Sequence, residues 1–156
     1  MTHENRKFGC INDTESAARI TFDINPESFK DSKSTEFAEI TIPGMSHPRL
    51  QFTNGANRTL SFTLFIHYGV TDDVPAAIKH LQSWLYPIYD GGHLKQAPSR
   101  LLLLFGDTWP DELWVMQSCN ITRKHFDKEL NCIFAEASIE LVEYIDTSKD
   151  ANEVRQ

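Results

Sequence analysis

The chain has 156 residues, of which 40% are apolar and 24% are charged, the balance of one soluble globular domain. Its formal net charge is −7, and a negative protein repels both phosphate backbones and anionic lipid surfaces. Nucleic-acid binding and membrane binding are therefore disfavoured. The longest apolar run, at residues 101–105, is too short to cross a bilayer, and the N-terminus lacks the apolar run of a secretory signal.

The two ends of the chain are polar and differ from its centre. We expect residues 1–17 to be a flexible arm and residues 147–156 to be a polar tail. Residues 18–146 contain no linker, repeat or low-complexity tract, so we expect a single domain there. The cysteines form no CxxC pair, which favours reduced thiols in an intracellular protein; they are Cys10, Cys119 and Cys132.

Alternating apolar and polar residues predict the first strands. Residues 18–24 alternate and stop at Asn25-Pro26, because proline has no donor for the next ladder bond. Residues 37–43 alternate again and stop at the turn pair Pro43-Gly44.

The segment PRLQFTNGANRTLSFTLFIHYG, residues 48–69, predicts a long hairpin. Asn54-Gly55 is a strong turn signal, so we expect residues 49–52 to pair with residues 58–67. One face of the second strand is apolar, with Leu60, Phe62, Leu64 and Ile66. The other face carries Thr59, Ser61, Thr63, Phe65 and His67. Either the docked helix or a neighbouring subunit would cover Phe65, and the sequence leaves both open.

A single helix is predicted at about residues 72–86. Thr71 or Asp72 is a suitable cap, and Pro75 fits the first turn, where its missing N–H costs nothing. Pro87 ends the helix. The apolar residues at helical spacing are Val74, Ile78, Leu81 and Leu85.

Three further strands are predicted after the helix, within residues 100–106, 113–122 and 132–144. Four strands, one helix and three strands indicate an α+β, mainly β, antiparallel fold rather than alternating βαβ units. We therefore expect a β-barrel or sandwich with one flanking helix, since closing the sheet removes exposed edges.

Catalytic and cofactor motifs are missing from the sequence. It has no P-loop, dinucleotide fingerprint, HExxH or GxSxG, and its six histidines show no metal-ligand spacing. Asp107, Asp111 and Glu112 near Trp109 could suggest a hydrolase, but acids in such a loop are typical turn formers. Cys119 has no apparent base. We predict no enzymatic activity, no cofactor and no metal site.

Two binding hypotheses remain. In the first, a small monomeric β-barrel binds a ligand or carbohydrate through aromatic side chains, namely Trp84, Tyr86, Tyr89, Trp109 and Trp114. In the second, the protein self-associates, because large apolar residues stand among small polar ones on the second strand faces. The interface residues predicted for that case are Phe65, His67, Phe134, Asn57 and Arg58.

The order of the motifs resembles a known family. Five stretches occur in the order of the family's motifs over residues 18–145: ITFDINPESFK, PRLQFTNGANRTLSFTLFIHY, VPAAIKHLQSWLYP, PSRLLLLFGD and ASIELVEY. In this respect the chain resembles the tube-protein-like N-terminal domain of contractile injection system and phage baseplate proteins that usually carry a LysM module. The resemblance implies a β-barrel similar to the tail-tube subunit, with one flanking helix.

The same resemblance implies a structural role as a tube initiator. Such proteins form a ring, expected to be hexameric, that joins the trimeric spike hub to the tail tube, starts tube assembly and anchors baseplate wedge proteins. DNA or cargo would pass through the lumen without specific binding, which suits the negative charge. The chain would be made in the bacterial cytoplasm and located in a virion tail, baseplate or other injection particle.

Three departures from the family pattern leave the position in the particle open between tube initiator and another tube-like ring. No LysM segment follows within these 156 residues. His67 and Tyr68 stand where an acid often follows the long strand, and KELNC replaces a Gly-x-Pro turn before the last strand.

Overall fold

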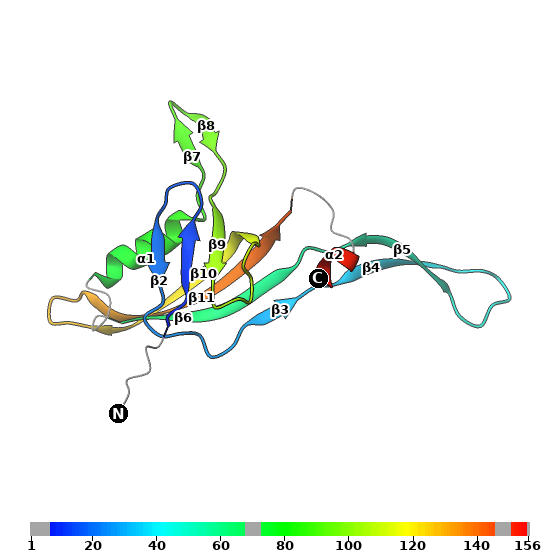
Figure 1. Cartoon of the computed structure of the whole chain (residues 1–156), viewed down its shortest axis with the longest axis horizontal. Helices are drawn as coiled ribbons and strands as arrows, with labels where there is room; N and C mark the ends of the chain where they lie inside the picture. Colours follow the sequence, from blue (N-terminus) through cyan, green and yellow to red (C-terminus); the bar gives the residue numbers. More distant parts are fainter. Residues whose placement is uncertain (1–6, 68–72, 146–150, 156) are drawn as a thin grey trace.

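The computed structural model describes residues 7–67, 73–145 and 151–155 (Figure 1). Its main feature is a seven-stranded antiparallel sheet in the order β2-β1-β9-β10-β11-β6-β3. The strands of this sheet are β1 (Cys10–Asp13), β2 (Arg19–Thr21), β3 (Lys30–Ser32), β6 (Thr59–His67), β9 (Arg100–Leu104), β10 (Leu113–Phe126) and β11 (Cys132–Tyr144). The prediction of a mainly β, antiparallel fold is confirmed.

Two separate hairpins project from this sheet (Figure 1). One is formed by β4 (Thr35–Ile40) and β5 (Arg49–Gly55), and the other by β7 (Ile88–Asp90) and β8 (His93–Gln96). We refer to the first, residues 35–55, as the β4–β5 arm, and to the second, residues 88–96, as the β7–β8 hairpin.

The large sheet is not closed into a barrel among the described residues. Its edges are β2 and β3, which follow each other in the sequence but lie at opposite ends of the strand order. Phe22 N–H donates to the Gly9 carbonyl at 2.8 Å and so continues the β1–β2 pairing, whereas Ile24 forms a single bridge with Phe65 of β6. The edge strands β2 and β3 themselves are not paired in the described sheet. Pro26, two residues after Ile24, cannot extend that ladder, because it has no N–H. Of the expected barrel or sandwich, the closed barrel is therefore corrected: the described sheet is open.

Helix α1 (Val74–Ser83) lies on one face of the sheet, against β6, β10 and β11 (Figure 1). The predicted range of 72–86 was too long. Asp73 is the N-cap, and its Oδ1 accepts from Ala76 N–H at 3.1 Å. The alternative caps Thr71 and Asp72 lie outside the described residues. A second short helix, α2 (Ala151–Val154), lies in the segment expected to be a polar tail.

The core lies between α1 and the sheet. The predicted apolar face of β6 is buried, with no residue from Leu60 to Ile66 on that face more than 5% exposed. From α1, Val74, Ile78 and Leu81 are completely buried, and each aliphatic side chain stabilises the fold by about 1.5–3 kcal/mol.

Strand β9 lies inside the sheet, between β1 and β10. Leu101 and Leu103 are completely buried, whereas Leu102 and Leu104 are half-buried, so only one face of this strand is fully covered. Its partner β1 lies within the segment expected to be a flexible arm. Cys10 and Ile11 are buried there, and this short apolar pair gives too little periodicity to stand out in a polar sequence.

The hairpin predicted from Asn54-Gly55 was wrong. Strand β5 pairs with β4, whereas β6 pairs with β11 and β3. Asn54 and Gly55 lie inside β5, and the reversal occurs at residues 41–48, where Gly44 has a φ of 85°. Pro43-Gly44 joins two strands that are adjacent in sequence, and this local pairing prevails over the Asn-Gly signal.

Candidate functional site

Four aromatic rings gather on the face of the sheet opposite α1. Phe65 of β6 stacks on Phe134 of β11, with ring centroids 6.1 Å apart. His67 and His125 each approach Phe134, at 5.8 and 5.7 Å between centroids. We call these four residues the outer-face cluster. It brings together three of the five predicted interface residues from β6 and β11 and adds His125 from β10.

The outer-face cluster is not covered by the helix. Phe65 and Phe134 are half-buried and His67 and His125 are exposed, while α1 packs on the opposite face. Beside Phe65 lies a shallow hollow of about 400 Å³ bounded by β6, β11 and the residues before β3. Of the two covers considered for Phe65, the docked helix is therefore excluded.

Arg58, at the start of β6, is bound within its own chain. Its Nε and Nη2 contact the two carboxylate oxygens of Asp31 at 2.9 and 2.6 Å, and Nη1 lies 2.9 Å from Glu112 Oε1. The same Nη1 is 4.0 Å from the buried Glu143, and the guanidinium lies over the Trp114 ring at 5.7 Å. Arg58 therefore ties β3, the loop before β10 and β11 together.

The pKa values of this network follow from its geometry. The hydrogen bonds from Arg58 lower the pKa of the Asp31 carboxyl below its usual range, although partial burial opposes this. The Asp31 carboxylate in turn raises the pKa of the Arg58 guanidinium. Arg58 is permanently charged, and its neighbour Asn57, also predicted at the interface, is exposed.

The β4–β5 arm is an exposed apolar surface that the sequence did not identify as a site. It extends away from the sheet (Figure 1), and its strands pair only with each other in the described ladders. Phe37, Leu50 and Phe52 are 54%, 65% and 61% exposed. A two-stranded hairpin is marginal alone, and a contiguous exposed apolar surface marks a contact site. The alternating pattern of residues 37–43 predicted a strand, but it did not predict that the hairpin would be separate from the main sheet.

The β7–β8 hairpin is a second exposed apolar projection and points in a different direction (Figure 1). Tyr89 and Leu94 face each other across it, and each is 63% exposed. Its turn is Gly91-Gly92, with φ of 57° and 83°, a conformation in which a side chain would be strained.

The structure does not assemble the alternative sites. Trp84, Trp109 and Trp114 are at most 5% exposed, so the aromatic residues proposed for ligand binding form no common surface with Tyr86 and Tyr89. The carboxylate of Glu112 is engaged by Arg58, and Asp107 and Asp111 are exposed.

The described residues also offer neither an activated cysteine nor a metal site. Burial raises the pKa of the Cys119 thiol, which disfavours the nucleophilic thiolate. Within residues 7–67, 73–145 and 151–155, no group of three or more His, Cys, Asp or Glu side chains could hold a metal ion. Neither helix in this part of the chain is long and apolar enough to cross a membrane.

Comparison with protein families gives a match to the family described as contractile injection system tube protein, over residues 7–152. A search of curated proteins gave no match. The match spans nearly the whole chain. The family is structural and non-enzymatic, its members generally form hexameric rings, and they are components of the tube of contractile injection particles. This chain belongs to the contractile injection system tube protein family.

Proposed function

We propose that this chain forms the ring that joins the central spike hub to the tail tube and starts tube assembly, in the baseplate of a phage tail or of another contractile injection device. A ring in this position contacts further copies of itself and a different layer on each side. Each subunit therefore needs several separate contact surfaces.

The observation that supports this role is the presence of two exposed apolar projections, the β4–β5 arm and the β7–β8 hairpin, which point in different directions (Figure 1). A single projection would serve one kind of contact. With two projections, one can contact copies within the ring and the other can contact an adjoining layer. Each projection carries exposed aromatic residues, Phe37 and Phe52 on the arm and Tyr89 on the β7–β8 hairpin, and aromatic residues are enriched at protein interfaces.

The outer-face cluster is a third contact surface in this proposal. Phe65, His67 and Phe134 would meet a neighbouring subunit, with Asn57 at the rim. Arg58 would support this surface from within by fixing the start of β6 against β3 and β11, since its donors are engaged there. The hub, the tube protein and the baseplate wedges are the expected partners, and the lumen would carry DNA or cargo without binding it.

Electron microscopy of whole particles tests the proposed position. We expect one ring of this chain at the hub–tube junction. Density distributed along the tube instead would contradict the adaptor role and leave membership of the tube family intact.

A variant of the β7–β8 hairpin tests the layer contact. Tyr89→Asp should leave ring formation intact and reduce growth of tube on the ring, because it places a charge in an apolar contact. His93, which pairs with Asp90 and precedes Leu94, lies on the opposite face of the same hairpin. His93→Asp is the matched control and should support normal growth. Equal effects of the two variants would remove the hairpin from the proposal.

A further inference from the structure

We propose that Asn54, which precedes Gly55 at the end of β5, is a site of spontaneous deamidation in the folded chain. The reaction needs no enzyme, cofactor or oxidant, and its only co-reactant is water. It converts the neutral Asn54 amide into a carboxylate on the β4–β5 arm. The inference concerns the chain itself and does not depend on the ring function proposed above.

The reaction is an attack of a backbone nitrogen on the preceding side chain. The Gly55 nitrogen loses its proton and bonds to the side-chain carbonyl carbon of Asn54. The C–N bond of the side-chain amide breaks, and its amino group takes up a proton and leaves as ammonia. Water then opens the cyclic succinimide at either carbonyl carbon and gives aspartate or isoaspartate. No group is oxidised or reduced.

The Gly55 N–H is not engaged in the β4–β5 ladder. Ala56 N–H donates to the Ser34 carbonyl at 3.0 Å, and Thr35 lies opposite Gly55. Hydrogen-bonded and non-hydrogen-bonded pairs alternate in an antiparallel ladder, so Thr35 and Gly55 form a non-hydrogen-bonded pair. The Gly55 N–H therefore points away from β4, to the side where β5 has no partner in the described sheets. No ladder bond holds the attacking nitrogen.

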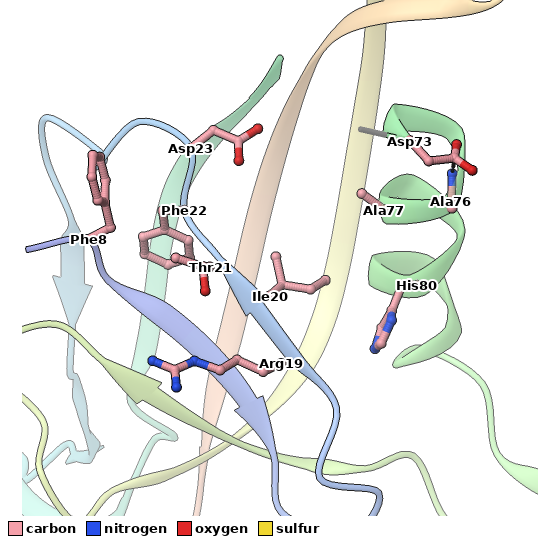
Figure 2. Close-up of a pocket in the computed structure, with 10 residues that line it drawn as sticks. All are labelled: Phe8, Arg19, Ile20, Thr21, Phe22, Asp23, Asp73, Ala76, Ala77 and His80. Carbon is pink, nitrogen blue, oxygen red and sulfur yellow. Dashed lines mark hydrogen bonds between the residues drawn. The ribbon is translucent and has the colours of Figure 1, made fainter. Parts of the chain in front are cut away.

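The Asn54 side chain is likewise not held. Within the described residues it forms no hydrogen bond. Asp73 shows the opposite arrangement at the start of α1 (Figure 2), where its Oδ1 accepts from Ala76 N–H at 3.1 Å. A side chain fixed in this way cannot turn towards the next backbone nitrogen, whereas the exposed Asn54 can.

The surroundings of Gly55 provide both space and a cation. A methyl group at this position would meet only the end of the Lys33 side chain, with Nζ at 3.5 Å. The Lys33 ammonium donates to the Ala56 carbonyl, so it is positioned beside this part of the backbone. Its charge stabilises the negative nitrogen that forms when the Gly55 N–H loses its proton.

Local opening of the arm supplies the backbone freedom that ring closure requires. A two-stranded hairpin is marginal by itself, and β5 pairs only with β4 in the described sheets. The register also shifts between Glu36 and Phe37, which leaves Thr53 as an extra residue directly before Asn54. Segments with few contacts open at a low cost in free energy. The last residues of β5 should therefore open more often than the main sheet.

The product should weaken the arm. Glu36 lies directly opposite Asn54, so deamidation places two carboxylates across the ladder, where like charges are destabilising. Isoaspartate also inserts a methylene group into the backbone of β5 and so displaces the adjoining ladder. Amide hydrogen exchange of residues 35–40 should be faster in the deamidated fraction than in the intact protein.

Peptide mapping by mass spectrometry tests the proposal on the full, folded chain during incubation at mildly alkaline pH. Asn57, which is exposed and precedes Arg58, is the internal control. Asn54 should deamidate several-fold faster than Asn57, because the glycine that follows it leaves the attacking nitrogen unhindered. The chain unfolded in urea gives the reference rates. If Asn54 deamidates in urea but stays intact in the folded chain, the proposal is overturned.

Two variants test the mechanism. Gly55 is not in the left-handed conformation, so Gly55→Ala fits without strain and should slow deamidation several-fold by crowding the attacking nitrogen. An unchanged rate in this variant would exclude attack by the Gly55 nitrogen.

Lys33→Met removes the neighbouring cation and should also slow the reaction. Lys79→Met, on the exposed side of α1, is the matched control and should deamidate at the wild-type rate. Equal rates for the two lysine variants would overturn the contribution of Lys33.

Discussion

Phe65 of β6 and Phe134 of β11 stack on each other across the sheet, with ring planes inclined by only 29°. The two residues are neighbours in register, since Phe134 pairs with His67 and Glu136 pairs with Phe65. The stacked pair lies on the face opposite α1 and is open to a further chain. It explains how a phenylalanine is accommodated on a polar strand face, because each ring shields one side of the other.

Replacement of Phe65 by aspartate should separate assembly from folding. The loss of the stacked pair costs only about 0.5–1.5 kcal/mol of stability. The thermal unfolding midpoint should therefore fall by a few degrees, while ring assembly, observed by negative-stain microscopy, should be lost.

Thr63→Asp, two residues earlier on the same face of β6, is the matched control and should assemble normally. Assembly of Phe65→Asp at the level of the wild type would exclude the outer-face cluster as a subunit contact.

Replacement of Arg58 by methionine should destabilise the fold, because it leaves the carboxylates of Asp31, Glu112 and Glu143 without their shared cation. We expect the free energy of unfolding in urea to fall by about 2–3 kcal/mol at neutral pH, below the full cost of a buried pair since Arg58 is partly exposed. Lys124→Met removes a more exposed pair with Glu136 and should cost less than about 1 kcal/mol.

The Arg58→Met variant should also change the pH dependence of stability. The pKa of Asp31 is lower in the folded chain than its usual value of 3.8, so its contribution is complete above that value and is lost as the pH falls through the folded pKa. Between about pH 5 and about pH 2, the wild type should therefore lose more stability than Arg58→Met. Parallel pH profiles for the two proteins would show that Arg58 does not stabilise the Asp31 carboxylate.

Replacement of Ile78 by alanine should weaken the docking of α1 on the sheet. Ile78 is completely buried, and a cavity at such a site costs about 2–5 kcal/mol. Urea denaturation measures this change. Lys79→Ala, on the exposed side of the same helix, should change stability by no more than about 0.5 kcal/mol. Similar values for the two variants would mean that α1 does not dock through Ile78.

The Cys119 thiol should react slowly in the folded protein. Burial raises its pKa, so little thiolate is present at mildly alkaline pH. Mass spectrometry after iodoacetamide treatment should show alkylation of Cys119 at least about tenfold slower than in urea-unfolded protein. Rapid modification of the folded chain would restore Cys119 as a candidate nucleophile.

Local periodicity explains which parts of the fold could be predicted. The alternation of residues 59–67 identified β6 and its buried face, and the spacing of Val74, Ile78 and Leu81 identified α1. By contrast, β1 and β3 are too short to show a period, and the pairing of β5 was misassigned because the Asn54-Gly55 signal competes with Pro43-Gly44.

The candidate contact surfaces could be predicted only in part. Phe65, His67 and Phe134 could be proposed from the sequence as contact residues, because large side chains on a polar face are visible there. The isolation of the β4–β5 arm and the engagement of Arg58 with Asp31 and Glu112 depend on residues far apart in the chain.

The sequence by itself determined the antiparallel, mainly β character of this protein, the single long helix and the face of β6 that is buried. These features follow from side-chain periods of two and 3.6 residues, which are local. Only the tertiary structure decided which strands pair, that α1 lies opposite Phe65, and that Phe37 and Phe52 are left exposed on an arm. Those outcomes depend on contacts between distant segments, whose relative energies a local pattern does not contain.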